Sequence, residues 1–202
     1  MNAEQAITEL TARLAVAERR LALLDAKEAV LRTLNHYLYC LDVGYPDELV
    51  RRVFTTDAVL EVVNFPPGTM EDHVLTGHAE ILPLYADHTR TAPAIQGGHH
   101  TSNIAVDVAA DASSAELTAY FMTSGGAAGS LQGGQYQGEA VPDGDGWRFR
   151  RFRILSGWGW RVPRDSVRPI TESLPAERAK GGARPAGTNI SPPSSAAAAA
   201  PA

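Results

Sequence analysis

Residues 24–62 read LDAKEAVLRTLNHYLYCLDVGYPDELVRRVFTTDAVLEV, and this stretch decides the fold. Its first half carries an apolar face with helical spacing, made of Leu31, Leu34, Leu38 and Leu41. Gly44 and Pro46 then predict a turn, with Pro46 at the start of a short second helix over residues 47–54. A strand-like run follows at 58–65, and a Pro-Pro-Gly sequence ends it. The stretch therefore predicts a helix, a turn, a second helix and a strand.

The sequence before this stretch predicts a helical arm over residues 1–23. Apolar residues recur there at alternating steps of three and four: Ile7, Leu10, Leu14, Ala17, Leu21 and Leu24. The next steps of that stripe include Glu28, Asn35 and Asp42, so we expect the helix to break or bend near Asp25. Charged residues lie beside the stripe. The arm is therefore interpreted as a coiled-coil segment that pairs with another subunit, in preference to one that packs back on its own domain.

The rest of the chain predicts mostly strands. A short helix is expected over residues 77–85, where Pro83 should end it early. β-type segments follow at 99–108, 115–123, 132–141 and 147–155. Helices first and antiparallel strands after them indicate an α+β domain in which a curved sheet wraps helices. Residues 166–202 form an extension whose Pro, Gly, Ser and Ala content predicts disorder from about residue 175.

The composition excludes several classes of protein. With 18 Lys and Arg against 23 Asp and Glu, the net charge is −5, which disfavours nucleic acid as a partner. Cys40 is the only cysteine, so neither an intrachain disulfide nor a zinc site of several thiolates can form. No apolar run reaches the roughly 18 residues of a membrane span, and the first residues do not resemble a secretory signal. We therefore expect no membrane partner and a cytoplasmic location.

Four segments carry a resemblance to a known family: residues 24–62, GHAEI at 77–81, HHTSNIAVDV at 99–108 and GWRFRRFRIL at 146–155. In this order they resemble SnoaL-like domains of the nuclear-transport-factor-2-like (NTF2-like) superfamily, over about residues 24–160. The resemblance implies an NTF2-like cone over residues 24–165, with a curved antiparallel or mixed sheet around the N-terminal helices. It also implies a small hydrophobic or aromatic substrate and assembly into a homodimer or homotrimer.

Within the superfamily the chain is similar to scytalone-dehydratase-like and bile-acid-dehydratase-like members, which place a Tyr and an Asp at a helix end and a His on a strand. Tyr37 and Asp42 have that spacing, and His99 stands where the family places its histidine. The resemblance implies His99 as the base that removes an acidic C–H proton, Asp42 as its orienting partner and Tyr37 as a donor to the developing enolate. Without the family motif, each residue has a simpler interpretation: Asp42 is a solvated turn residue and His99 is a surface residue.

Adjacent residues of a strand point to opposite faces, so only one of His99 and His100 can enter a pocket. Alternation favours His100 if the pocket lies on the face of Ile104, Val106 and Val108, which share its parity. The family motif favours His99. We take His99 as the catalytic candidate and keep His100 as the alternative.

Further residues are candidates for substrate binding. Tyr39, three residues before Asp42, shares a helix face with it more nearly than Tyr37 does. Asn103 and His100 belong to the same strand motif as His99. Arg153 would meet an anionic or enolate oxygen, and Trp158 would cap a site for an aromatic ligand. Surface ion pairs for the arginine and core or dimer packing for the tryptophan are the competing interpretations.

The sequence holds no motif for a metal or a cofactor. Its histidines match no metal-binding spacing such as HExxH, and the glycine-rich segment at 125–138 contains neither GxGxxG nor GxxxxGK[ST]. The expected function is a cofactor-independent dehydratase-type lyase that uses His/Asp general acid–base catalysis on a hydrophobic polycyclic or aromatic, polyketide- or steroid-like substrate. An isomerase or polyketide cyclase with the same residues is one alternative. A non-catalytic ligand-binding protein or scaffold, similar to oxygenase β-subunits, is the other.

Overall fold

The computed structural model describes residues 2–64, 71–91, 98–125 and 130–161, all of which fall in one unit of the chain, residues 1–166. Helices α1 (Ala3–Val43) and α2 (Pro46–Val53) come first, followed by strands β1 (Phe54–Val63) and β2 (His73–Thr76) and helix α3 (Gly77–Thr91). Four longer strands complete the described part: β3 (His99–Val108), β4 (Ala115–Gly125), β5 (Ser130–Asp143) and β6 (Gly146–Arg161). The sequence predicted all of these elements except β2.

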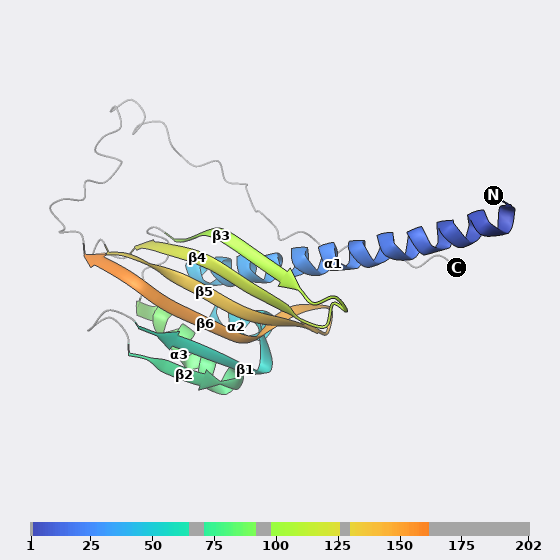
Figure 1. Ribbon diagram of the computed structural model, residues 1–202. Helices are drawn as coiled ribbons and strands as arrows, with labels where there is room; N and C mark the ends of the chain where they lie inside the picture. Colours follow the sequence, from blue (N-terminus) through green and yellow to red (C-terminus); the bar gives the residue numbers. More distant parts are fainter. Residues whose placement is uncertain (1, 65–70, 92–97, 126–129, 162–202) are drawn as a thin grey trace, which may run out of the picture. The chain divides into compact units, whose positions relative to one another are not determined.

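The six strands form one curved sheet in the order β2-β1-β6-β5-β4-β3 (Figure 1). Strands β1 and β6 are parallel, and every other neighbouring pair is antiparallel. The sheet is therefore mixed, and the predicted α+β fold with a curved sheet around the helices is confirmed. The predicted disorder of the C-terminal extension concerns residues outside the described part. None of the described helices is long and apolar enough to cross a membrane.

Helix α1 runs unbroken for 41 residues, so the expected break near Asp25 is wrong. Asn2 caps its start, because its side chain accepts from the Gln5 N–H while the Gln5 side chain accepts from the Asn2 N–H. Gly44 ends the helix in the left-handed conformation at φ 81°. The polar positions of the stripe do not end the helix, because from Ala26 onward one side of it is buried, whereas the residues before Ala26 are not.

Helix α3 continues past Pro83 to Thr91, so the expected early end is also wrong. A proline inside a helix costs about 3 kcal/mol, because it removes one backbone hydrogen bond and crowds the preceding turn. Ile81 and Tyr85, on either side of Pro83, are both buried. Burying a large apolar side chain contributes about 1.5 to 3 kcal/mol, so the two together offset the cost.

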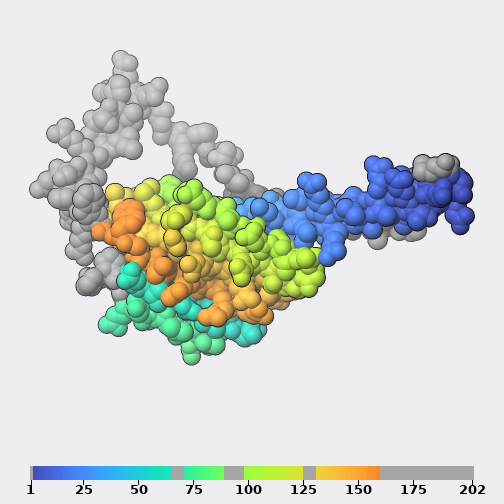
Figure 2. Space-filling view, viewed as in Figure 1, coloured from blue at the N-terminus to red at the C-terminus, as the bar shows by residue number. Residues whose placement is uncertain are grey.

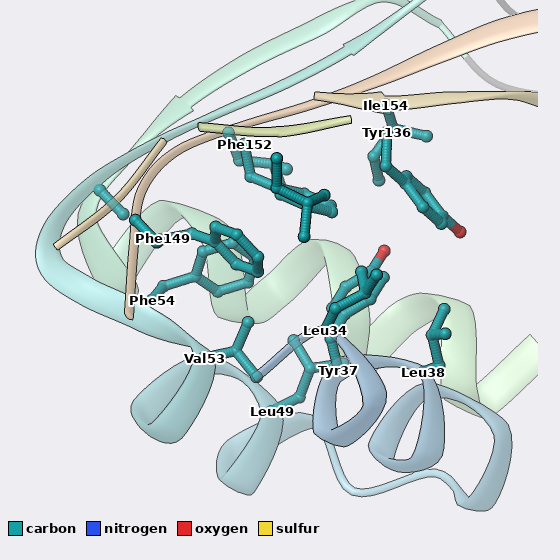
Figure 3. Packing of buried hydrophobic residues seen from close by; sticks show 14 of the residues in the cluster. Leu34, Tyr37, Leu38, Leu49, Val53, Phe54, Tyr136, Phe149, Phe152 and Ile154 are labelled. Atoms are coloured by element: carbon teal, nitrogen blue, oxygen red, sulfur yellow. The ribbon is translucent and has the colours of Figure 1, made fainter. Parts of the chain in front are cut away.

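The core lies between the helices and one face of the sheet, which we call the inner face. Figure 3 shows Tyr37 reaching from α1 toward Tyr136 and Phe152 of the sheet. The centroid of the Tyr37 ring lies 5.1 Å from that of Phe152 and 5.8 Å from that of Tyr136. These three side chains are at most 1% exposed. An aromatic cluster of this kind fixes the second half of α1 against the sheet.

A bulge in β3 decides which histidine faces inward. His99 lies opposite Thr123 of β4, but the register shifts between Ser102 and Ala105, and beyond the shift Val106 lies opposite Leu117. Residues directly opposite each other in a sheet share a face, and Thr123 and Leu117 lie on the same face of β4. His99 and Val106 therefore both lie on the inner face despite their unlike parity, and the alternation argument for His100 fails.

Candidate active site

His99, at the start of β3, and Asp42, in the last turn of α1, form a close pair. His99 Nδ1 lies 2.6 Å from Asp42 Oδ1, and the His99 backbone N–H also donates to the two carboxylate oxygens, at 3.2 and 3.1 Å. The side chains are 16% and 27% exposed. A carboxylate only accepts hydrogen bonds, so the proton sits on Nδ1 and the lone pair of the neutral ring sits on Nε2. The pair is a base with a fixed tautomer.

A glycine shapes the approach of these two residues. Gly98 has φ 84°, a conformation that L side chains rarely adopt, and a Cβ atom there would lie 3.1 Å from Asp42 Oδ2. Gly98 thus lets β3 begin directly beside the carboxylate.

Asp42 is ionised in this setting. Burial alone would raise the pKa of its carboxyl, but the hydrogen bonds from the His99 side chain and backbone, with the charges of His99 and His100, hold the pKa below 3.8. A permanent negative charge therefore faces the imidazole.

Three buried tyrosines lie together in the core, with the ring centroid of Tyr37 6.0 Å from that of Tyr85 and 5.8 Å from that of Tyr136. The Tyr85 hydroxyl donates to the Tyr37 hydroxyl at 3.3 Å, and all three, Tyr37, Tyr85 and Tyr136, are at most 3% exposed. Burial raises the pKa of each hydroxyl well above 10, and the charge of Asp42 raises the pKa values of Tyr37 and Tyr136 further. The phenols therefore stay protonated, so each hydroxyl is neutral and still has a proton to donate. Tyr37 was predicted, whereas Tyr85 and Tyr136 were not.

His88 of α3 is a second histidine close to the pair that sequence reasoning missed. Burial lowers its pKa below 6.5, the charge of His99 lowers it further, and Asp42 and Asp87 raise it. This histidine was missed because the helix was expected to end early at Pro83, so residue 88 was not placed on the helix. Once α3 continues past that proline, His88 follows Tyr85 at a step of three, on the same face of the helix.

We expect His88 to make stability depend on pH. The unfolded chain gains a proton as the pH falls through about 6.5, while folded His88 resists it, so stability is complete above that pH and falls below it. Between about pH 7 and about pH 5.5, the melting temperature of His88→Gln should therefore fall less than that of the native chain. The dependence should not vanish, because burial also lowers the pKa of His36. Exposed His100→Gln is the control, and its melting temperature should follow pH as that of the native chain does. If the melting temperature of His88→Gln also depends on pH as steeply as that of the native chain, the expectation is contradicted.

The remaining predicted residues of β3 and α1 do not join the pair. Tyr39 is 56% exposed, and its ring packs against that of Tyr45. Asn103 is exposed at the β3 bulge with φ 51°. His100 is exposed and, next to His99 on the strand, points to the other face of the sheet. For these three, the structure gives no contact that supports a role in substrate binding.

The two candidates of β6 lie on the outer face of the sheet. Arg153, between buried Phe152 and Ile154, points outward and pairs with Glu61 at 3.3 Å. Trp158 is 48% exposed, and its ring lies against Gly133, where an added Cβ would meet it at 2.4 Å. Arg153 therefore forms a surface ion pair and Trp158 forms a packing contact, as the competing interpretations expected.

A model of the SnoaL-like domain matches residues 22–153. The chain belongs to the SnoaL-like family. The match agrees with the resemblance found over residues 24–160 and accounts for the helices and strands around the pair. No curated protein sequence matches this SnoaL-like chain.

Solved structures share the fold of this SnoaL-like chain. A protein from Novosphingobium aromaticivorans named "Putative Scytalone Dehydratase" is 21% identical, with a TM-score of 0.56, covering 73% of this chain and 92% of that one. A hexachlorocyclohexane dehydrochlorinase, LinA Type2, is 14% identical with a TM-score of 0.59, covering 74% and 97%. An NTF2-like protein with a cystatin-like fold, also from Novosphingobium aromaticivorans, is 21% identical with a TM-score of 0.55, covering 74% and 88%. At these identities the likeness shows the fold.

The inner face of the SnoaL-like sheet turns polar toward the start of β3. Strand registers place Thr101, Thr123, Gln132 and Ser156 on that face. Ser156 is 1% exposed, and among the described residues its hydroxyl has no hydrogen-bond partner. A buried hydroxyl without a partner costs free energy. Sequence reasoning missed these residues because it did not place the strand faces.

One group of described residues has the spacing of a metal site. His36 and Cys40 of α1 and Glu48 of α2 offer ligand atoms that all lie within 4.8 Å of one another. His36 Nε2 lies 3.5 Å from Cys40 Sγ and 3.4 Å from Glu48 Oε1. Burial, with the charge of Glu48, raises the pKa of the Cys40 thiol to about 11, so the thiol is protonated near neutral pH. Arg52 also contacts Glu48, at 3.8 Å, and the group serves as a polar contact between the two helices.

Proposed function

We propose that this protein is a cofactor-independent lyase that eliminates water from a β-hydroxy carbonyl compound with a hydrophobic polycyclic or aromatic framework. The observation that carries the proposal is the half-buried Asp42–His99 pair, with 2.6 Å between Oδ1 and Nδ1. An imidazole with this partner has its Nε2 lone pair free of the carboxylate. A base of this kind suits removal of a C–H proton beside a carbonyl near neutral pH.

The reaction balances without an added reagent. His99 Nε2 takes the proton from the carbon beside the carbonyl, and the electron pair of that C–H bond forms an enolate. The enolate then expels the β-hydroxyl as its C–O bond breaks, and the imidazolium returns its proton to the departing oxygen. Water and a conjugated enone result. Asp42 contributes by stabilising the imidazolium between the two steps.

Neutral donors near the pair suit the charge that develops on the substrate. Tyr37, Tyr85 and Tyr136 stay protonated because burial raises their pKa values. A hydroxyl in such a setting stabilises an enolate oxygen more than it stabilises the neutral carbonyl. The buried Ser156 hydroxyl, further along the inner face, offers a second polar contact to a large substrate.

The comparisons support this reaction class at a coarse level. The names of two structural neighbours, a scytalone dehydratase and a dehydrochlorinase, both denote eliminations. An elimination needs a base near the substrate carbon, and we propose His99 for that role in this SnoaL-like chain.

A panel of β-hydroxy ketones on aromatic and polycyclic frameworks tests the proposal. We expect at least one to lose the mass of water with the native chain, with the absorbance of a conjugated enone appearing at the same rate. A product of unchanged mass would instead identify an isomerase or a cyclase. Binding of these compounds without any conversion would favour a non-catalytic ligand-binding protein.

The pair itself is testable without a substrate. His99→Phe keeps a ring of similar bulk but removes both nitrogens, so Asp42 loses its strongest donor. The pKa of Asp42 should rise in this variant, because burial raises it and only the backbone N–H and the charge of His100 still lower it. The carboxyl carbon shift of Asp42, followed against pH by NMR, measures this. An unchanged Asp42 pKa would show that the side chains do not pair in solution.

A further inference from the structure

The first half of α1 carries an apolar stripe that its own chain leaves uncovered. Ile7, Leu10, Leu14, Leu21 and Leu24 are between 54% and 65% exposed. A stripe of this length is costly to leave in water, since each large apolar side chain loses about 1.5 to 3 kcal/mol of burial. Figure 2 shows this part of α1, in dark blue, as exposed surface.

Near the arm, the domain contacts a different face of the same helix. Arg19 donates to the backbone oxygen of Ala110, in the β3–β4 connection, at 3.2 Å, and Ala26 and Val30 further along α1 are buried. In heptad positions, with Ile7 at position a, Arg19 and Ala26 occupy position f and Val30 occupies position c. Positions c and f lie opposite the a/d seam. Packing against its own domain therefore leaves the stripe open, which argues against the arm folding back.

The stripe follows three heptads. Position a holds Ile7, Leu14 and Leu21, and position d holds Leu10, Ala17 and Leu24. Such a repeat, kept over three heptads, is the pattern of a coiled coil. The first heptad, with Ile7 at a and Leu10 at d, has the combination that favours two strands, and no heptad has the Ile at d that favours higher oligomers. We propose that the arm forms a parallel, in-register, two-stranded coiled coil with a second copy of this chain.

Charges beside the seam determine the partner and its direction. Position g holds Arg13 and Arg20, and position e holds Glu18 and Asp25. In a parallel pair in register, position g faces position e of the next heptad on the other chain, so Arg13 meets Glu18 and Arg20 meets Asp25, each twice by symmetry. In an antiparallel pair, position g faces position g and the arginines repel. Within the described residues of one chain, none of these four forms an ion pair, so they are available to the second copy.

The mass of the full chain in solution, measured by light scattering during gel filtration, is the first test. We expect a dimer at micromolar concentration that dissociates to monomer in the seam variant Leu14→Asp/Leu21→Asp. The matched control is Val16→Asp, because Val16 is 70% exposed but occupies position c, off the seam. A native monomer or trimer, or a dimer that survives Leu14→Asp/Leu21→Asp, overturns the proposal.

Charge reversal tests the pairing. Arg13→Glu/Arg20→Glu should raise the dissociation constant at least tenfold, because acidic side chains then occupy both e and g. Adding Glu18→Arg and Asp25→Arg to the same chain should restore the native value. Failure of the fourfold variant to recover, in a chain whose circular dichroism remains native, rules out these e/g pairs.

A cysteine at one end of the seam tests the direction. In a Cys40→Ala background, Leu10→Cys should form a disulfide with its own copy under mild oxidation, since equal residues meet across a parallel seam. Val16→Cys should not. No Leu10→Cys cross-link in a proven dimer would mean an antiparallel or a different interface. None of these readouts depends on activity, so they stand apart from the proposed reaction.

Discussion

Replacing His99 by phenylalanine is expected to lower the rate of the proposed elimination by about 10²- to 10⁴-fold, the usual contribution of a positioned general base. The fold should survive, because the new ring has a similar size and His99 is only half-buried at the start of a strand. The rate constant at saturating substrate should fall more than KM rises, since the imidazole acts on the proton in transit and not on the bound framework. Rates and melting temperatures of native and variant chains measure both quantities.

Asp42→Asn should lower the rate of the proposed elimination nearly as much. The cause here is a change of the His99 tautomer, because the base itself is still present. An asparagine amide can donate to Nδ1, which would move the ring proton to Nε2 and remove the lone pair that accepts the substrate proton. Residues that act as one unit give effects that do not add. The double variant His99→Phe/Asp42→Asn should therefore be about as slow as His99→Phe alone.

His100→Phe is the matched control for the first prediction. It changes a neighbouring histidine of the same strand that faces away from Asp42, so the rate should stay within about twofold of native. A large loss in His100→Phe with full activity in His99→Phe would reverse the assignment. Full activity in both, with the fold intact, would remove the histidines from the reaction altogether.

The family motif in the sequence predicted the pairing of His99 with Asp42, whereas the periodicity of the strand did not. Alternation pointed to His100, because an extra residue in β3 changes the face of everything beyond it. The one local sign of that bulge is Asn103, since asparagine tolerates the positive φ that the bulge requires. Asparagine also occurs in regular strands without a bulge, so the sign gains meaning only when the register is known.

Helix lengths escaped sequence reasoning for a different reason. The stripe that ends near Asp25 and the proline at position 83 are local signals, whereas both helices continue because of what they pack against. Tyr85 and His88 lie at and beyond the point where α3 was expected to end. His88, whose pKa is affected by both His99 and Asp42, was thus lost with the helix end. For Arg153 and Trp158 the competing interpretations stayed open, because the sequence does not tell which face of β6 points inward.

Gly134→Ala is expected to have the largest effect on stability. At Gly134 the register between β5 and β6 shifts, with Gly133 opposite Trp158 and Gly134 opposite Ser156. A Cβ atom on Gly134 would lie 2.0 Å from the backbone oxygen of Leu155 and 2.9 Å from the Phe121 ring. The Phe121 ring is itself buried and stacked on Tyr136, and the backbone oxygen belongs to the strand itself. The methyl group must therefore separate β5 from β6, where paired hydrogen bonds hold the sheet together.

Such a separation should cost about 3 kcal/mol or more, above the usual range for overpacking by one methyl group. For a chain of this size that lowers the melting temperature by about 6 to 12 °C. Gly146→Ala is the control, because its φ is not in the left-handed region and nothing lies within 4 Å of its added Cβ. It should stay within about 0.5 kcal/mol of native in denaturant unfolding. If Gly134→Ala has the same melting temperature as the native chain, the bulge accommodates the methyl group freely. The inward placement of Ser156, which depends on the bulge, is then not fixed.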